Sequence, residues 1–148
     1  MVELRGSRTH QHLLEAFARE AQATVLLDHY AQIAEIEGYP EAADALRELA
    51  ASQKLQAHGH LDYLRLVGDP ATGLPVGATD NNLMAVLTAD GADQRDAYPT
   101  MARTAHAEGF PEIASWFETL AHSKRHHASR VRELIDEHDE PSSSVGRR

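Results

Sequence analysis

The sequence predicts an all-α protein, a four-helix bundle made of two helical hairpins that are joined by a long crossover. Apolar residues recur at alternating steps of three and four, which is the period of amphipathic helices, and no segment shows the strict alternation of a strand. Glycine and proline cluster in three places and leave four long segments. A chain of 148 residues with 42% hydrophobic residues suits one domain with a core.

The three clusters of turn-forming residues differ in length. The first, "EGYP" at 37–40, and the last, "EGFP" at 108–111, are short, whereas "GDPATGLPVGAT" at 68–79 is long. Short connections join antiparallel neighbours, so each short turn is expected inside one hairpin and the long stretch is expected to cross between them. We expect the domain to span 1–138. The tail at 139–148 contains few apolar residues and is expected to be disordered.

An internal repeat relates the two predicted hairpins. The stretches "EGYPEAADALRELAASQKLQA" and "EGFPEIASWFETLAHSKRHHA" match without a gap at the Glu-Gly-aromatic-Pro turn and at several later positions, including the final alanine. The two hairpins are therefore expected to be structurally equivalent.

Charge and composition exclude several classes of function. A net charge of −9 argues against a nucleic-acid or anionic-membrane surface, because such surfaces need clustered lysine and arginine. The absence of cysteine excludes disulfides, thiolate nucleophiles and cysteine-ligated zinc or iron–sulfur sites. The start of the chain has no apolar leader, and no window reaches the roughly 18 apolar residues that a membrane span needs. A cytoplasmic location is the expectation.

A layer of polar residues interrupts the inward-facing apolar positions of all four predicted helices at matching heights. One glutamate, histidine or lysine on a helix is usually a solvated surface group. Several that converge from four helices are harder to explain in that way, because an unpaired buried charge is costly. We therefore treat these residues, called the polar layer below, as the candidate functional site; they are Glu20, Gln53, Gln56, Asp90, Asp93, Lys124 and His127.

Four stretches resemble the rubrerythrin family: "LRGSRTHQHLLEAFAREAQA", "EGYPEAADALRELAASQK", "GLPVGATDNNLMAVL" and "AYPTMARTAHAEGFPEIASWF…KRHHA". The resemblance covers about residues 4–134. It implies a ferritin-like four-helix bundle with a dimetal site of glutamates and Glu-x-x-His pairs, and a homodimer. The rubredoxin-like domain of full-length rubrerythrins is not expected here, so no internal rubredoxin electron donor is expected.

The polar layer coincides with the family's ligand positions but departs from the ligand types. By this resemblance Glu20 and His127 keep the residue type of the family ligand. Two family glutamates of the third predicted helix are replaced by Asp90 and Asp93, and a family histidine is replaced by Gln56. The two glutamates that bridge the metals in the family fall on Gln53 and Lys124. An ordinary diiron site is therefore not expected, and Lys124 is the candidate charge substitute for a metal ion.

Three hypotheses follow for the altered site. The first is a metal-free or repurposed bundle in which Lys124 pairs with the carboxylates and function lies in partner binding or scaffolding. The second is a non-haem oxidoreductase that acts on peroxide or dioxygen through a single iron or manganese ion, bound by Glu20, Asp90, Asp93 and His127. Three carboxylates and one ammonium leave two uncompensated negative charges, which one divalent cation would cancel. The third is an organic ligand in the former metal cavity, with Lys124 as acid, base or nucleophile.

Overall fold

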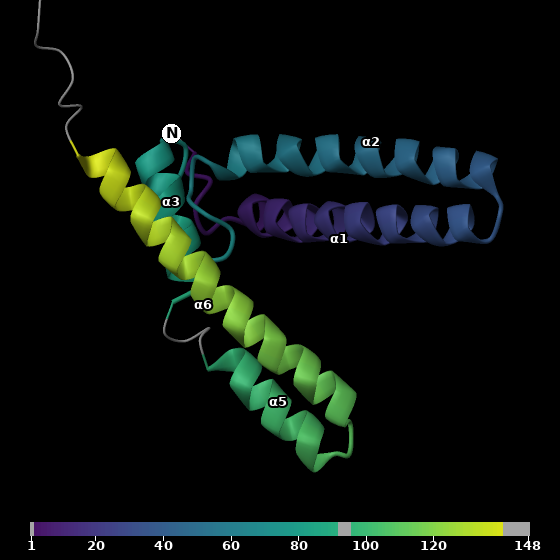
Figure 1. The fold of residues 1–148 in the computed structure, drawn as a ribbon. Helices are drawn as coiled ribbons and strands as arrows, with labels where there is room; N and C mark the ends of the chain where they lie inside the picture. Colours follow the sequence, from purple (N-terminus) through teal and green to yellow (C-terminus); the bar gives the residue numbers. More distant parts are fainter. Residues whose placement is uncertain (1, 92–95, 141–148) are drawn as a thin grey trace, which may run out of the picture. The chain divides into compact units, whose positions relative to one another are not determined.

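The computed structural model describes residues 2–91 and 96–140 and divides the chain into two compact units, Met1–Gly73 and Leu74–Arg148. The described residues form helices and no strand (Figure 1). Unit 1 contains α1 (Arg8–Ile36) and α2 (Pro40–Leu64), and unit 2 contains α3 (Thr79–Ala89), α5 (Ala97–Ala107) and α6 (Pro111–Asp139). The predicted all-α, ferritin-like class is confirmed. Most of the predicted disordered tail, 141–148, lies outside the described residues.

The turn of unit 1 ends α1 and starts α2 within three residues. The Gly38 N–H donates to the Glu35 carbonyl at 3.1 Å, and the Tyr39 N–H donates to the Ala34 carbonyl at 2.8 Å. This pair of bonds is the Schellman motif, which needs a left-handed residue that glycine adopts easily, and Gly38 has φ +85°. Pro40 then occupies the first position of α2, where a missing N–H costs nothing. The sequence "EGYP" therefore closes the hairpin.

The turn of unit 2 repeats this geometry. The Gly109 N–H donates to the His106 carbonyl at 3.2 Å, and the Phe110 N–H donates to the Ala105 carbonyl at 2.8 Å. Gly109 has φ +87°, and Pro111 begins α6. Each position corresponds to the residue 71 places earlier in unit 1, so the internal repeat seen in the sequence is also a structural repeat.

Alanines form the buried contact between the helices of each unit. In α2 the buried residues are spaced by seven, and the same holds in α6. The side chains at these helix contacts are small, which favours a close approach of the two helix axes. Large apolar side chains such as Leu49 and Trp116 instead stay more than half exposed within their units. We call the buried alanines of these helix contacts the alanine rows; they are Ala31, Ala34, Ala43, Ala50 and Ala57 in unit 1 and Ala102, Ala105, Ala114, Ala121 and Ala128 in unit 2.

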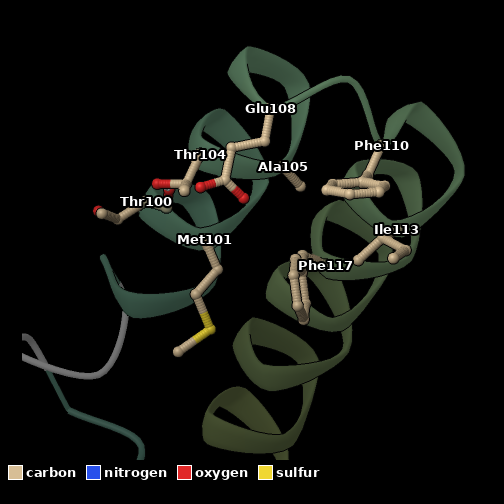
Figure 2. Close-up of a pocket in the computed structure, with 8 residues that line it drawn as sticks. All are labelled: Thr100, Met101, Thr104, Ala105, Glu108, Phe110, Ile113 and Phe117. Carbon is tan, nitrogen blue, oxygen red and sulfur yellow. Dashed lines mark hydrogen bonds between the residues drawn. The ribbon is translucent and has the colours of Figure 1, made fainter.

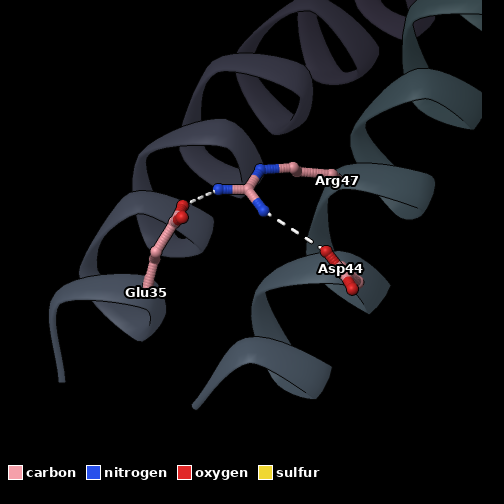
Figure 3. A network of polar contacts seen from close by, with 3 residues as sticks. All are labelled: Glu35, Asp44 and Arg47. Atoms are coloured by element: carbon pink, nitrogen blue, oxygen red, sulfur yellow. Dashed lines mark hydrogen bonds and ion pairs between the residues drawn. The ribbon is translucent and has the colours of Figure 1, made fainter. Parts of the chain in front are cut away.

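A polar side-chain contact near each turn joins the two helices of the hairpin. In unit 1 the Arg47 guanidinium of α2 binds Glu35 of α1 and also reaches Asp44 at 3.4 Å (Figure 3). The equivalent positions in unit 2 are His106 of α5 and Glu118 of α6, whose side chains lie 3.3 Å apart. The acidic partner has thus changed helix while the contact has stayed in place.

Among its described residues, the region expected to form one long third helix contains two separate helices. The first, α3, ends at Ala89 with Asp90 as its C-cap, and the second, α5, begins at Ala97. Glycine fits the end of α3, because a Cβ on Gly91 would lie 2.9 Å from the Thr88 carbonyl oxygen and a larger residue would need a shift. Both helices pack against α6, α3 along its C-terminal part and α5 along its N-terminal part (Figure 1).

Among the described residues, no helix combines the length and the hydropathy that a membrane span requires.

The alanine rows predict a strong dependence on side-chain size. Ala50 is 2% exposed against α1, whereas its neighbour Ala51 is exposed on the same helix. We expect Ala50→Leu to lower the free energy of unfolding by about 1–3 kcal/mol, because the added carbons would push the helices apart. The matched control Ala51→Leu should change it by less than about 0.5 kcal/mol. Urea denaturation followed by circular dichroism measures both, and equal effects would show that the row is not tightly packed.

Two glycines of unit 1 predict opposite responses to the same substitution. Gly38→Ala should destabilise the protein by about 1–2 kcal/mol, because alanine is strained in the left-handed region. Gly59 lies inside α2 with nothing within 4 Å of an added Cβ, so Gly59→Ala should stabilise it by about 0.5–1 kcal/mol. The two melting temperatures should move in opposite directions, and a loss of stability in both variants would contradict this account.

Candidate functional site

The polar layer divides between the two units. Unit 1 carries Glu20 on α1 and the two glutamines on α2. Unit 2 carries Asp90 at the end of α3 and both Lys124 and His127 on α6. Asp93 lies outside the described residues.

An ion pair links two members of the polar layer in unit 2. The Lys124 Nζ donates a hydrogen bond to Asp90 Oδ1 at 3.2 Å. The Asp90 side chain is 14% exposed and the Lys124 side chain 44%, so the carboxylate is the more enclosed partner. The ammonium therefore supplies the positive charge that this shielded carboxylate needs.

Helix ends and helix rows place these two groups together. Asp90 is the C-cap of α3, and its own N–H donates to the Val86 carbonyl at 3.2 Å, which fixes the residue at the point where the helix stops. Lys124 lies between the buried alanines Ala121 and Ala128 of α6, three residues after the first and four before the second. It is therefore on the edge of the buried row, where a long side chain can reach across while its stem stays packed.

A second carboxylate contact lies within unit 1. Glu20 Oε2 of α1 and His60 Nε2 of α2 are 3.7 Å apart, and the two side chains are 23% and 28% exposed. The separation is too long for a direct hydrogen bond. The Thr24 hydroxyl donates to the Glu20 backbone carbonyl at 2.8 Å, within the same stretch of α1.

The remaining members of the polar layer are less enclosed in their own units. Gln53 is half-buried, and Gln56 and His127 are exposed. In α2 the buried row contains Ala43, Ala50 and Ala57. Each lies one residue after a position that the heptad pattern predicts to face inward, namely Ala42, Leu49 and Gln56. The sequence thus identified the correct side of the helix but not the row that the hairpin itself buries.

His60 was not among the site residues inferred from the sequence. Its signal is a spacing, since it follows Gln56 by four residues and therefore lies one helical turn further along the same side of α2.

Within the described part of each unit, no three histidine, aspartate or glutamate side chains form a group that could hold a metal ion. The two close contacts of the polar layer are instead pairs, a carboxylate with an ammonium in unit 2 and a carboxylate with an imidazole in unit 1.

A hollow of about 340 Å³ lies near the turn of unit 2 (Figure 2), and neither Asp90 nor Lys124 lines it. Its walls are mostly apolar, and Glu108 is its only titratable lining residue. This chemistry does not suit metal binding or acid–base catalysis. The lining residues are Thr100, Met101, Thr104, Ala105, Glu108, Phe110, Ile113 and Phe117.

Comparisons with known proteins agree with the resemblance in the sequence. The family model described as Rubrerythrin matches residues 79–148. The chain is 34% identical to a rubrerythrin of Porphyromonas gingivalis over 137 residues, which cover 89% of this chain and 68% of that protein. It is 30% identical to a rubrerythrin of Nitratidesulfovibrio vulgaris, over 88% of this chain and 70% of that protein. With Rubrerythrin-1 of Clostridium acetobutylicum the identity is 29%, over 91% and 73%. The chain therefore belongs to the rubrerythrin family.

Proposed function

We propose that this chain is a rubrerythrin-like protein in which the two-metal site has been lost and an internal ammonium replaces one of the ions. The observation that carries the proposal is the 3.2 Å contact between Lys124 Nζ and Asp90 Oδ1. A carboxylate that would otherwise bind a cation is already neutralised by a cation that belongs to the chain. On this proposal the bundle is repurposed, and the pair of Asp90 and Lys124 requires no metal.

The donor set supports the same conclusion. A two-metal centre of this family needs anionic carboxylates that bridge its two ions, but the two positions that match the family's bridging glutamates hold Gln53 and Lys124. An amide is a neutral, weaker ligand, and an ammonium has no lone pair to offer. These residues do not fit a two-metal centre, so no reaction step is assigned to one.

A second candidate function is a single-metal oxidoreductase that acts on peroxide or dioxygen. The observation that favours it is that, within unit 1, Glu20 lies beside His60, an imidazole that can itself act as a metal ligand. The sequence proposed Glu20, Asp90, Asp93 and His127 as the ligands of this ion. Of the two carboxylates among them that the structure describes, Asp90 is bound to Lys124, which leaves Glu20 as the one more available to a metal.

Restoring the family's ligand types should restore two-metal binding. In the triple variant Lys124→Glu, Gln53→Glu and Gln56→His, we expect about two iron ions per chain after anaerobic loading with ferrous iron, because both bridging carboxylates return. The measurement is the metal content of desalted protein by mass spectrometry. The matched control keeps the changes at Gln53 and Gln56 but carries Lys124→Gln, and it should not bind the second ion. Two ions in the wild-type protein would contradict the proposal directly.

The second candidate predicts that one loaded ion has redox activity. Wild-type protein loaded with ferrous iron under anaerobic conditions should consume about one equivalent of peroxide per two chains, since each ferrous ion supplies one electron. Glu20→Gln should abolish this consumption, whereas Glu15→Gln, on an exposed position of the same helix, should not affect it. Stopped-flow absorbance of the ferric product measures the reaction. Equal rates with and without Glu20 would eliminate this candidate.

A further inference from the structure

The hollow near the turn of unit 2 combines an apolar wall with one carboxylate. Figure 2 shows the rings of Phe110 and Phe117 on the α6 side and the carboxylate of Glu108 on the α5 side. Met101 and Ile113, which complete the apolar wall, are each about half exposed within unit 2. Small-molecule sites in proteins range from about 300 to 1,000 Å³, are mostly apolar and contain a few polar groups. At about 340 Å³, the hollow has the size and the lining of a site for a small organic molecule.

The charge at the hollow comes from Glu108. Among the residues that the structure describes, no side chain donates to its carboxylate or forms an ion pair with it. The two hydroxyls of the lining are already engaged, because Thr104 Oγ1 donates to the Thr100 carbonyl at 3.2 Å and Thr100 Oγ1 accepts from Arg103 at 3.0 Å. Glu108 is also the C-cap of α5, and the C-terminal end of a helix carries partial negative charge. Both features favour a cation beside Glu108.

The repeat of 71 residues identifies what is particular to unit 2. Glu37 corresponds to Glu108, and each is the C-cap of its helix with the same right-handed backbone conformation. Ile33, however, corresponds to Thr104, so unit 2 has a shorter side chain at a position that lines the hollow. The same turn geometry is thus combined with a smaller residue in unit 2, and the repeat itself supplies the substitution that would fill the space, Thr104→Ile.

We propose that this hollow binds a small organic ammonium ion with an aromatic body. The ammonium lies beside the Glu108 carboxylate, and the aromatic body packs against Phe110 and Phe117. An aromatic ring face also attracts a cation directly, so the rings serve both parts of the ligand. A carboxylic acid of the same shape is excluded, because its charge would face Glu108. This inference goes beyond the proposed function and does not depend on it, because the hollow shares no residue with the polar layer.

The test is calorimetric titration of the full chain at neutral pH with phenethylamine, which is then an ammonium ion, and with phenethyl alcohol, which has the same shape without the charge. We expect one phenethylamine per chain with a dissociation constant of about 1 mM or lower, a range that a ligand of this size can reach. The alcohol should bind at least fivefold more weakly. Glu108→Gln should lower the affinity for the amine to that for the alcohol. The matched control Glu37→Gln changes the corresponding residue of unit 1 and should leave both affinities unchanged.

A second variant tests the place of binding. Thr104→Ile should abolish binding of both ligands, because the larger side chain fills the hollow. Circular dichroism checks the fold, and Thr104→Leu serves as the second substitution if Thr104→Ile unfolds. Absence of binding to the wild-type protein, equal affinities for amine and alcohol, or unchanged binding in the filled variant would each overturn the inference. An equal loss in Glu37→Gln and Glu108→Gln would overturn it as well. None of these results affects the metal count of the triple variant, which tests the proposed function separately.

Discussion

Each unit depends on the contact between its helices at the alanine rows. Alanine at every seventh position keeps one side of the helix narrow from Ala43 to Ala57 in α2 and from Ala114 to Ala128 in α6, so two helices can pack together there without large side chains between them. Such a contact gains little from each side chain but costs almost no rotamer entropy, because alanine has none to lose. The turns add to this by ending one helix and starting the next within a few residues.

The position of the polar layer follows from this narrow contact. Residues beside the alanine rows are only partly shielded, so charged groups can occupy those positions if a partner is close. Lys124 meets Asp90 in unit 2, and Glu20 meets His60 in unit 1. With 44% of the lysine side chain exposed, its ion pair contributes no more than about 1 kcal/mol to stability. Its importance is chemical, because it changes what the carboxylate can bind.

The repeat of 71 residues shows which features the hairpin geometry requires and which can change. The Schellman turns and the alanine rows occur in both units, and these are the features that set backbone geometry. A polar contact near the turn occurs in both units, but its glutamate lies on the first helix of the hairpin in unit 1, Glu35, and on the second in unit 2, Glu118. The polar layer has changed furthest, and Gln53 corresponds to Lys124. Backbone constraints are thus stricter than the chemistry of the side chains beside them.

Much of the fold followed from the sequence alone. Apolar periodicity, the "EGYP" and "EGFP" turns and the internal repeat determine the helices, their hairpins and their equivalence, because these signals are local and each has one low-energy geometry. The sequence also placed Asp90 and Lys124 in the same polar layer and predicted that Lys124 pairs with carboxylates. It did not reveal that α3 ends at Ala89, since a single glycine such as Gly91 is often tolerated in a helical pattern.

Only the tertiary structure decided which polar groups meet. Within unit 1, His60, one turn beyond Gln56, is the imidazole that lies beside Glu20. Periodicity assigns a residue to one side of a helix, yet it does not determine which partner on the neighbouring helix stands at the same height. That depends on how the two helices are aligned along their length, and the alanine rows and the turn set this alignment together.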